Sequence, residues 1–481
     1  MRNVKKVLKL YIIIYGIIFL HGTAYGINMP KGALLRVPLG VATGEFKKTL
    51  EKVAIDRLTG KLQRMLKPSG LQAARQRAQK EAGIQSITVL DVLPKSVERY
   101  GNQLQKGFDS LSGLTTARTI ISPSPDFITD IKAINPDITI VQAHGAEAAI
   151  DQEPIFQDMP YSGKIIVLVH RPEEFLLRYK DKGIDALRQK ADVIALLDES
   201  MLDDYKKLFP DKIIVVIRHG FFDKGYLDGS RLKKDAVVCV GSITTWGEMR
   251  DPKDVFELNK ALLDKKSGIK FLGYIGGKFD KHVSIQDYKD RKDTWFLGND
   301  EILKAGPFKD ELSFRNWLYT SAEGRVIFRT EVFDGIAQPE LSKWESHIVD
   351  FNIQAYREIL SEDNRPKREA SGTLHLEGGP AIGVVIDSPA MRDIIRKEGM
   401  RMVLMPHLGK GKLDYNKTAD EVIKIAKNPN RRRNIIKTNI RAAEKLSMSE
   451  IAFAYHLVAQ TLLQGPKEGT RKLTRGPDNS L

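Results

Sequence analysis

The stretch REASGTLHLEGGPAIGVVIDSP, residues 368–389, combines two carboxylates, a turn of small residues and a buried strand. Glu369 and Glu377 flank the Ser-Gly-Thr turn, and the apolar run Val384–Ile386 follows them. A Gly turn between a strand and a helix exposes backbone N–H groups that suit a phosphate. The flanking carboxylates can accept hydrogen bonds from sugar or ribose hydroxyls. We therefore expect this stretch to close an α/β domain and to carry a ligand site.

The spacing of the two glutamates is not specific by itself. Glu323 and Glu331, in EGRVIFRTE, are also eight residues apart. The Ser-Gly-Thr turn and the strand after it distinguish Glu369 and Glu377 from this second pair.

The chain around this stretch alternates short β-branched runs with helical stretches, a pattern typical of parallel sheets covered on both faces. A first series of strands is predicted at 87–94, 137–145, 164–170, 191–198 and 212–220, with a helix at 100–111. A second series is predicted at 236–242, 270–277, 325–330, 347–353 and 383–388, with a helix at 253–264. Two doubly wound domains bind ligands at the carboxyl ends of their strands, and a cleft between them suits a reaction of two substrates.

The sequence therefore predicts an α/β protein of two Rossmann-like parallel-sheet domains, with carboxyl-terminal helices packing back. The predicted parts are a signal peptide or signal anchor at 1–26, a basic helical leader at 27–83, an amino-terminal domain at 84–233, a second domain at 234–412, carboxyl-terminal helices at 413–465 and a disordered tail at 466–481.

The charge is concentrated at the amino terminus. Residues 1–83 hold 16 Lys and Arg against four Asp and Glu, a balance of +12 within a chain total of +15. The rest is nearly neutral, whereas a duplex-binding domain needs a basic stripe on its folded surface. We expect no nucleic-acid partner. The leader helix is expected either to pack on the main body, the favoured interpretation, or to lie on an anionic membrane surface through residues 1–83.

The first residues resemble a targeting segment. Arg2, Lys5, Lys6 and Lys9 precede an apolar run at 10–20, with small residues at cleavage spacing near Ala24. Such a segment normally exports its passenger, and a start at Met29 would remove it while leaving the basic leader. The single cysteine, Cys239, lies in the apolar run AVVCV and is interpreted as core, and no metal-ligand spacing is found.

From residue 84 to about 463 the chain resembles the retaining GT-B glycosyltransferases, which include bacterial mannosyl- and glucosyltransferases. The resemblance rests on E-x7-E around SGTL and on six further segments: INPDITIVQAHG, KIIVLVHRP, ADVIALLDES, KIIVVIRHGFFD, AVVCVGSITTWGEMRDPKDVFEL and FNIQAYRE. It implies transfer of a hexose from a nucleotide-diphosphate sugar to a glycan or lipid-linked acceptor, with retention. It implies neither a metal nor a permanently bound cofactor. It also implies chemistry at the cytoplasmic face, which conflicts with export by the amino-terminal segment unless the chain starts at Met29.

The resemblance also implies site residues. Glu369 and His170 would act at the transferred sugar, and Glu377 would bind the nucleotide ribose. The acceptor side would hold Gly101 and His144. The remaining donor-binding residues would be Gly372, Thr373, Leu374, Lys253, the less favoured Arg250, and Gly241.

Some positions depart from the family. Gly378, Gly379 and Pro380 follow Glu377, where the family has helix formers, and this lowers helix propensity by several kcal/mol. Ser242 replaces an Arg that many members use to bind the diphosphate. Two alternatives therefore stay open: a catalytically degraded relative acting as a binding or scaffold module, and a GT-B sugar-nucleotide epimerase.

Overall fold

The structure is a computed structural model. It describes residues 37–78, 86–122, 127–144, 153–157, 163–218, 220, 239–244, 252–267, 269–275, 292, 294–297, 301, 304–309, 313, 317, 320–321, 326–329, 351–354, 382–409 and 412–464.

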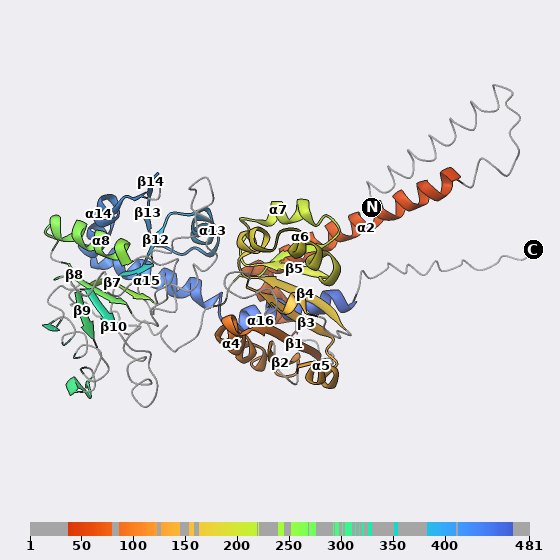
Figure 1. Cartoon of the computed structure of the whole chain (residues 1–481), viewed down its shortest axis with the longest axis horizontal. Helices are drawn as coiled ribbons and strands as arrows, with labels where there is room; N and C mark the ends of the chain where they lie inside the picture. The colour runs from red at the N-terminus through yellow and green to blue at the C-terminus, as the bar shows by residue number, and fades with distance from the viewer. Residues whose placement is uncertain are drawn as a thin grey trace, which may run out of the picture. The chain divides into compact units, whose positions relative to one another are not determined.

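The amino-terminal sheet has six parallel strands in the order β2-β1-β3-β4-β5-β6 (Figure 1). Its strands are β1 (Ile87–Pro94), β2 (Thr115–Ser122), β3 (Ile138–Ala143), β4 (Lys164–Val169), β5 (Val193–Leu196) and β6 (Ile213–Val216). All residues of β3 are buried, as a strand covered on both faces requires. The predicted strand at 87–94 is confirmed. The other predicted strands of this series are shorter in the structure, with β5 and β6 at half their predicted length or less, and β2 was not predicted.

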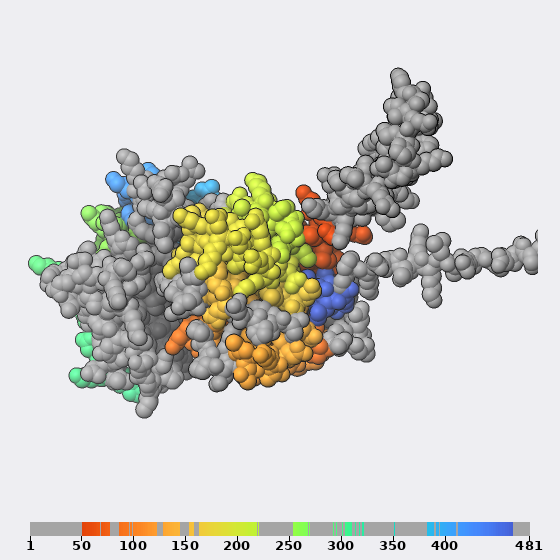
Figure 2. All heavy atoms as spheres, turned by 45° about the vertical axis from the view of Figure 1, so that its right-hand side comes forward, coloured from red at the N-terminus to blue at the C-terminus, as the bar shows by residue number. Residues whose placement is uncertain are grey.

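Helices connect these strands and cover the sheet. They are α4 (Glu98–Asp109), α5 (Phe127–Ile134), α6 (Pro172–Lys190) and α7 (Leu202–Leu208), with short 3-10 turns at η1 (Lys95–Val97) and η3 (Pro154–Phe156). Residues of α6 and α7, yellow to lime, form part of the surface in Figure 2. Phe175 and Tyr179 on α6 are buried in a core with Tyr205 and Phe209. The apolar residues at helical spacing thus explain why α6 lies on the sheet.

The second sheet has seven strands in the order β13-β12-β11-β7-β8-β10-β9, and all its pairings are parallel. Its strands are β7 (Cys239–Thr244), β8 (Lys270–Ile275), β9 (Thr294–Leu297), β10 (Val326–Arg329), β11 (Phe351–Gln354), β12 (Ile382–Ile386) and β13 (Val403–Met405). The five predicted strands of this series are confirmed with shifted ends. Strands β9 and β13 were not predicted from the sequence, nor was the small hairpin of β14 (His407–Gly409) and β15 (Lys412–Leu413).

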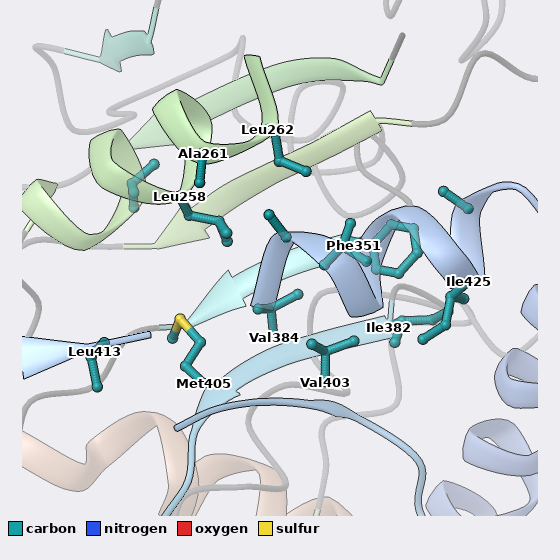
Figure 3. Packing of buried hydrophobic residues seen from close by; sticks show 14 of the residues in the cluster. Leu258, Ala261, Leu262, Phe351, Ile382, Val384, Val403, Met405, Leu413 and Ile425 are labelled. Atoms are coloured by element: carbon teal, nitrogen blue, oxygen red, sulfur yellow. The ribbon is translucent and has the colours of Figure 1, made fainter. Parts of the chain in front are cut away.

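Helices of this half enclose a continuous apolar core (Figure 3). They are α8 (Pro252–Asp264), α14 (Tyr415–Ala426) and α15 (Pro429–Glu444), whereas α13 (Pro389–Glu398) packs through Met391 into a second, smaller cluster with Val385 and Ala443. The core joins Leu258 of α8 to Phe351, Val384 and Met405 of the sheet. The Ser388 hydroxyl accepts a hydrogen bond from the Met391 N–H, 3.2 Å away, and so caps the start of α13.

The last helix, α16 (Met448–Gln464), packs on α4, β1 and β4 of the amino-terminal half. It is apolar on most sides, and all its residues from Ile451 to Ala459 are buried. A Cβ added to Gly107 of α4 would lie 2.4 Å from the Met448 carbonyl oxygen, so glycine allows this close approach. The prediction of carboxyl-terminal helices that pack back is confirmed.

In the described part of the chain, the first sheet is preceded by α2 (Val37–Met65) and α3 (Pro68–Ala78). The chain divides into two units, residues 1–57 and 58–481, and α2 runs across the boundary. Within the second unit, α3 contacts α16: Arg75 pairs with Glu450, and its guanidinium lies 5.7 Å from the centre of the Phe453 ring.

Among the described helices, none combines the length and apolarity needed to cross a bilayer. The apolar run at 10–20 and the predicted tail at 466–481 lie outside the described residues.

Candidate functional site

Buried polar side chains gather on neighbouring strands toward the carboxyl edge of the amino-terminal sheet. Asp91 lies in β1 and Gln142 in β3, while His170 directly follows β4. These three strands are neighbours in the order β1-β3-β4, and the His170 N–H extends the ladder to the Ala143 carbonyl at 2.9 Å. Parallel α/β sheets bind their ligands at this edge.

The three side chains form a hydrogen-bonded chain. Nε2 of Gln142 lies 2.7 Å from each carboxylate oxygen of Asp91, and Oε1 of Gln142 lies 2.9 Å from Nε2 of His170. Asp91 is 1% exposed, Gln142 0% and His170 6%. Polar groups this deeply buried are costly unless they are hydrogen-bonded, and here each one has a partner.

Two tyrosines enclose the hydrogen-bonded side chains of Asp91, Gln142 and His170. The Tyr100 ring of α4 stands at 89° to the His170 ring, with 5.2 Å between their centres. Tyr455 of α16 is 1% exposed. Burial raises the pKa of Asp91 to about 7, although the Gln142 hydrogen bond opposes the shift. Burial, together with the Asp91 charge, also raises the pKa of Tyr100, so both phenols stay protonated at neutral pH.

His144 lies beside His170, with 5.9 Å between the ring centres. Its Nδ1 is buried and has no hydrogen-bond partner among the residues that the structure describes. Burial lowers the pKa of His144 to about 3, and the charges of Arg171 and Arg178 lower it further, so the imidazole is neutral. Its backbone N–H donates to the carboxylate of the fully buried Glu153 at 3.1 Å.

The structure thus brings together three predicted residues, His170, His144 and Gly101. Gly101 follows Tyr100 in α4, where an added Cβ would lie 2.2 Å from Cδ2 of Leu93. Glycine at 101 therefore allows α4 to lie against β1 and presents Tyr100 to His170. An acceptor-side role for Gly101 and His144 stays a prediction.

The predicted donor residues belong to the second half. Gly241 lies in β7, and Lys253 lies in the first turn of α8. The other predicted donor-side residues, Arg250, Glu369, Gly372, Thr373, Leu374 and Glu377, lie outside the described residues.

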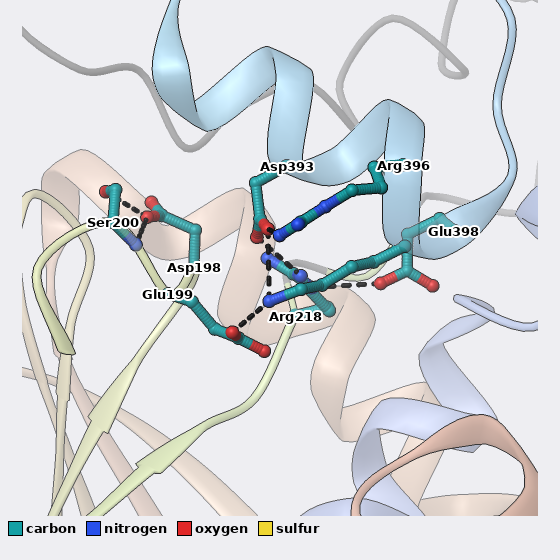
Figure 4. A network of polar contacts seen from close by, with 8 residues as sticks. Asp198, Glu199, Ser200, Arg218, Asp393, Arg396 and Glu398 are labelled. Carbon is teal, nitrogen blue, oxygen red and sulfur yellow. Dashed lines mark hydrogen bonds and ion pairs between the residues drawn. The ribbon is translucent and has the colours of Figure 1, made fainter.

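A second polar cluster surrounds Arg218, which closely follows β6 (Figure 4). Its Nε donates to Glu398 at 2.9 Å and one terminal nitrogen donates to Asp393 at 3.0 Å, both on α13. Lys397 pairs with Glu199 and lies 3.0 Å from Asp393. Burial opposes ionisation of Asp393, but the hydrogen bonds from Arg218, Lys397 and Arg396 outweigh it and lower its pKa.

Four residues of these clusters were not predicted from the sequence: Asp91, Gln142, Tyr100 and Arg218. A signal was present for the first two, because each is a polar residue inside an otherwise apolar run, in ITVLDVLP and ITIVQA. A buried strand places a polar side chain there only with a partner. Arg218 carried no comparable signal, because its partners are 175 and 180 residues away in the sequence.

No family model and no curated protein matches the chain. Among solved structures, it resembles an α-glucosyltransferase in complex with UDP and a 13-mer DNA, with a TM-score of 0.50 and 12% identity over 79% of this chain and 100% of that one. The catalytic domain of starch synthase IV from Arabidopsis thaliana, bound to ADP and acarbose, gives a TM-score of 0.48 and 9% identity, covering 78% of this chain and 98% of that one. TarM gives a TM-score of 0.42 and 13% identity, covering 69% of this chain and 57% of that one.

Of these three structures, the α-glucosyltransferase reaches a TM-score of 0.50, and at 12% identity its likeness bears on the fold alone. Its likeness spans four fifths of this chain and agrees with the two parallel sheets and the returning helix α16. The chain therefore has the Rossmann-like GT-B fold.

Proposed function

We propose that the protein is a glycosyltransferase that moves a hexose from a nucleotide-diphosphate sugar to a glycan or lipid-linked acceptor, with retention and without a metal. The buried Asp91–Gln142–His170 chain at the carboxyl edge of the amino-terminal sheet is the observation that supports it most. Its support lies in the combination of this chain with the GT-B fold.

The chemistry needs a polar group of this kind. Breaking a glycosyl–phosphate bond leaves negative charge on the diphosphate and oxocarbenium character on the sugar. A buried, hydrogen-bonded imidazole holds its position, so it can bond a sugar hydroxyl without reorganising. In this proposal His170 contacts the transferred hexose.

The donor side of the proposal rests on residues 369–377 and on Lys253. Backbone N–H groups of Gly372, Thr373 and Leu374 and the Lys253 ammonium would stabilise the leaving diphosphate, and one such donor is worth about 3 kcal/mol. Glu369 would bond the sugar and Glu377 the ribose. A phosphate leaving group needs little protonation, so the paired general acid of a glycosidase is not required.

Calorimetric titration with UDP, GDP and ADP tests the proposal. Wild type is expected to bind one of them, and Glu377→Ala to bind it at least tenfold more weakly, because a hydrogen bond to a carboxylate is worth about 1.5–3 kcal/mol. Glu331→Ala is the matched control, since Glu331 has the same spacing from Glu323 without the Ser-Gly-Thr turn. A wild type that binds none of the three nucleotides would overturn the transferase proposal.

A non-catalytic relative is the second candidate, favoured by Gly378, Gly379 and Pro380 directly after Glu377. Such a protein would bind the nucleotide sugar without releasing nucleoside diphosphate in the presence of any acceptor. Turnover measured with the nucleotide that binds separates the two candidates.

The cellular site is also a proposal. We infer that residues 1–83 hold the protein at an anionic membrane surface, because +12 of the net charge lies there. Mass spectrometry of the native amino terminus distinguishes a retained segment, a cleaved signal and a start at Met29. Binding to anionic but not neutral vesicles is expected for a chain that keeps residues 30–83.

A further inference from the structure

We infer that Asp91 and Gln142 are positioning residues that fix His170 in the tautomer protonated at Nε2. The inference follows from the hydrogen-bond chain itself, and its consequence for the reaction rests on the proposed function.

Asp91 determines the orientation of the Gln142 side-chain amide. An ionised carboxylate only accepts hydrogen bonds, and both oxygens of Asp91 lie 2.7 Å from Nε2 of Gln142. The opposite amide orientation would place a carbonyl oxygen against that carboxylate in a site that excludes water. Asp91 therefore determines that the Gln142 carbonyl oxygen points the other way, toward His170.

The Gln142 carbonyl in turn determines the tautomer of the His170 imidazole. A carbonyl oxygen cannot donate, so the 2.9 Å contact with Oε1 of Gln142 requires the proton on Nε2 of His170. In a neutral imidazole the other nitrogen, Nδ1, then accepts. The rings of Tyr100 and His144, centred 5.2 and 5.9 Å from that of His170, limit rotation of the imidazole.

This tautomer has a consequence for the substrate. A neutral imidazole whose Nδ1 can only accept suits a group that donates, such as a sugar hydroxyl, and disfavours a phosphate oxygen. His170 is thus prepared for the hexose rather than for the diphosphate. A buried carboxylate in the middle of β1, costly in itself, gains a purpose in the same arrangement.

The tautomer is directly measurable in the full-length protein. Selective ¹⁵N-histidine labelling gives separate signals for Nδ1 and Nε2 of the nine histidines, and His170→Asn identifies the His170 pair by its disappearance. The spectrum is best recorded near pH 8.5, above the pKa of Asp91 of about 7. For His170 we expect a protonated Nε2 and an unprotonated Nδ1. A wild-type protein in which Nδ1 is protonated and Nε2 is not would overturn the inference without any variant.

Two variants test the origin of the tautomer. Asp91→Asn offers both a donor and an acceptor, so the Gln142 amide can turn round and the Nε2-protonated share should fall toward about half. Gln142→Met, close in size, removes the acceptor and should also mix the tautomers. An unchanged single tautomer in both folded variants would contradict the inference.

A control and an activity measurement complete the test. Thr115→Val removes the 2.9 Å contact with Nδ1 of His456, so it should alter the His456 signals and leave those of His170 unchanged. If the tautomer is as inferred but His170→Ala binds and turns over nucleotide sugars like wild type, the proposed function fails and the positioning of His170 stands.

Discussion

Arg218 offers the sharpest test of how burial affects the strength of an ion pair, because it binds two carboxylates that are largely buried. The side chains of Arg218, Asp393 and Glu398 are 12%, 12% and 6% exposed. Replacing Arg218 by Ala leaves both carboxylates largely buried without their main partner. Breaking a buried ion pair in this way costs about 3–5 kcal/mol, and we expect a loss near the lower end because Lys397 also lies 3.0 Å from Asp393.

Arg396 provides the matched control for this prediction. It bonds the same Asp393 at the same 3.0 Å, but its side chain is 75% exposed, so Arg396→Ala should cost at most about 1 kcal/mol. Arg218→Lys keeps the charge but loses the planar fork of donors, so its loss in free energy of unfolding should lie between those of Arg218→Ala and Arg396→Ala. Urea unfolding of the four proteins gives the free energies. Equal losses for Arg218→Ala and Arg396→Ala would refute the claim that burial decides the value of these ion pairs.

Three further predictions concern the amino-terminal half. The pKa of Asp91 is about 7 in the folded protein and about 3.9 in the unfolded chain, so the free energy of unfolding should fall as pH rises between these values and level off above about 7. Asp91→Asn should reduce this pH dependence, and an unchanged difference between urea unfolding at pH 5 and at pH 8 would contradict the raised pKa of Asp91. Gly101→Ala should lower the free energy of unfolding by about 1–3 kcal/mol, because the added Cβ forces α4 away from Leu93. Gly60→Ala should raise it by up to about 1 kcal/mol, because the nearest atom to its added Cβ is 3.7 Å away, and equal shifts in melting temperature for the two variants would contradict the packing argument. Arg75→Ala should cost about 1 kcal/mol through loss of the Glu450 pair and the Phe453 contact, and no change in the urea midpoint would contradict a docking role for α3.

The strands could be predicted where their sequence is both apolar and long. ITVLDVLP gave the bounds of β1, because a strand covered on both faces admits almost only apolar residues. TWFL, which forms β9, has four residues, and VLM, which forms β13, has three. Runs this short carry no periodicity, and they become strands only because a neighbour in the sheet supplies the hydrogen bonds.

The site was predictable at the ends of strands and not within them. His170 and His144 follow β4 and β3, and the rule that α/β ligands bind at carboxyl ends placed both correctly at this edge. Asp91 and Gln142 are 51 residues apart, and only the pairing of β1 with β3 makes them partners. Pairings of this kind depend on the order of strands in the sheet, which local sequence does not contain.

The central claim is that His170 binds the hexose of a nucleotide sugar, and comparative calorimetry tests it most directly. Wild type and His170→Ala would each be titrated with the nucleoside diphosphate that binds and with its hexose conjugate. We predict an unchanged affinity for the diphosphate and a roughly tenfold weaker affinity for the conjugate, the value of about one hydrogen bond. A wild type that binds neither ligand, or a His170→Ala variant that binds both as wild type does, would contradict the account.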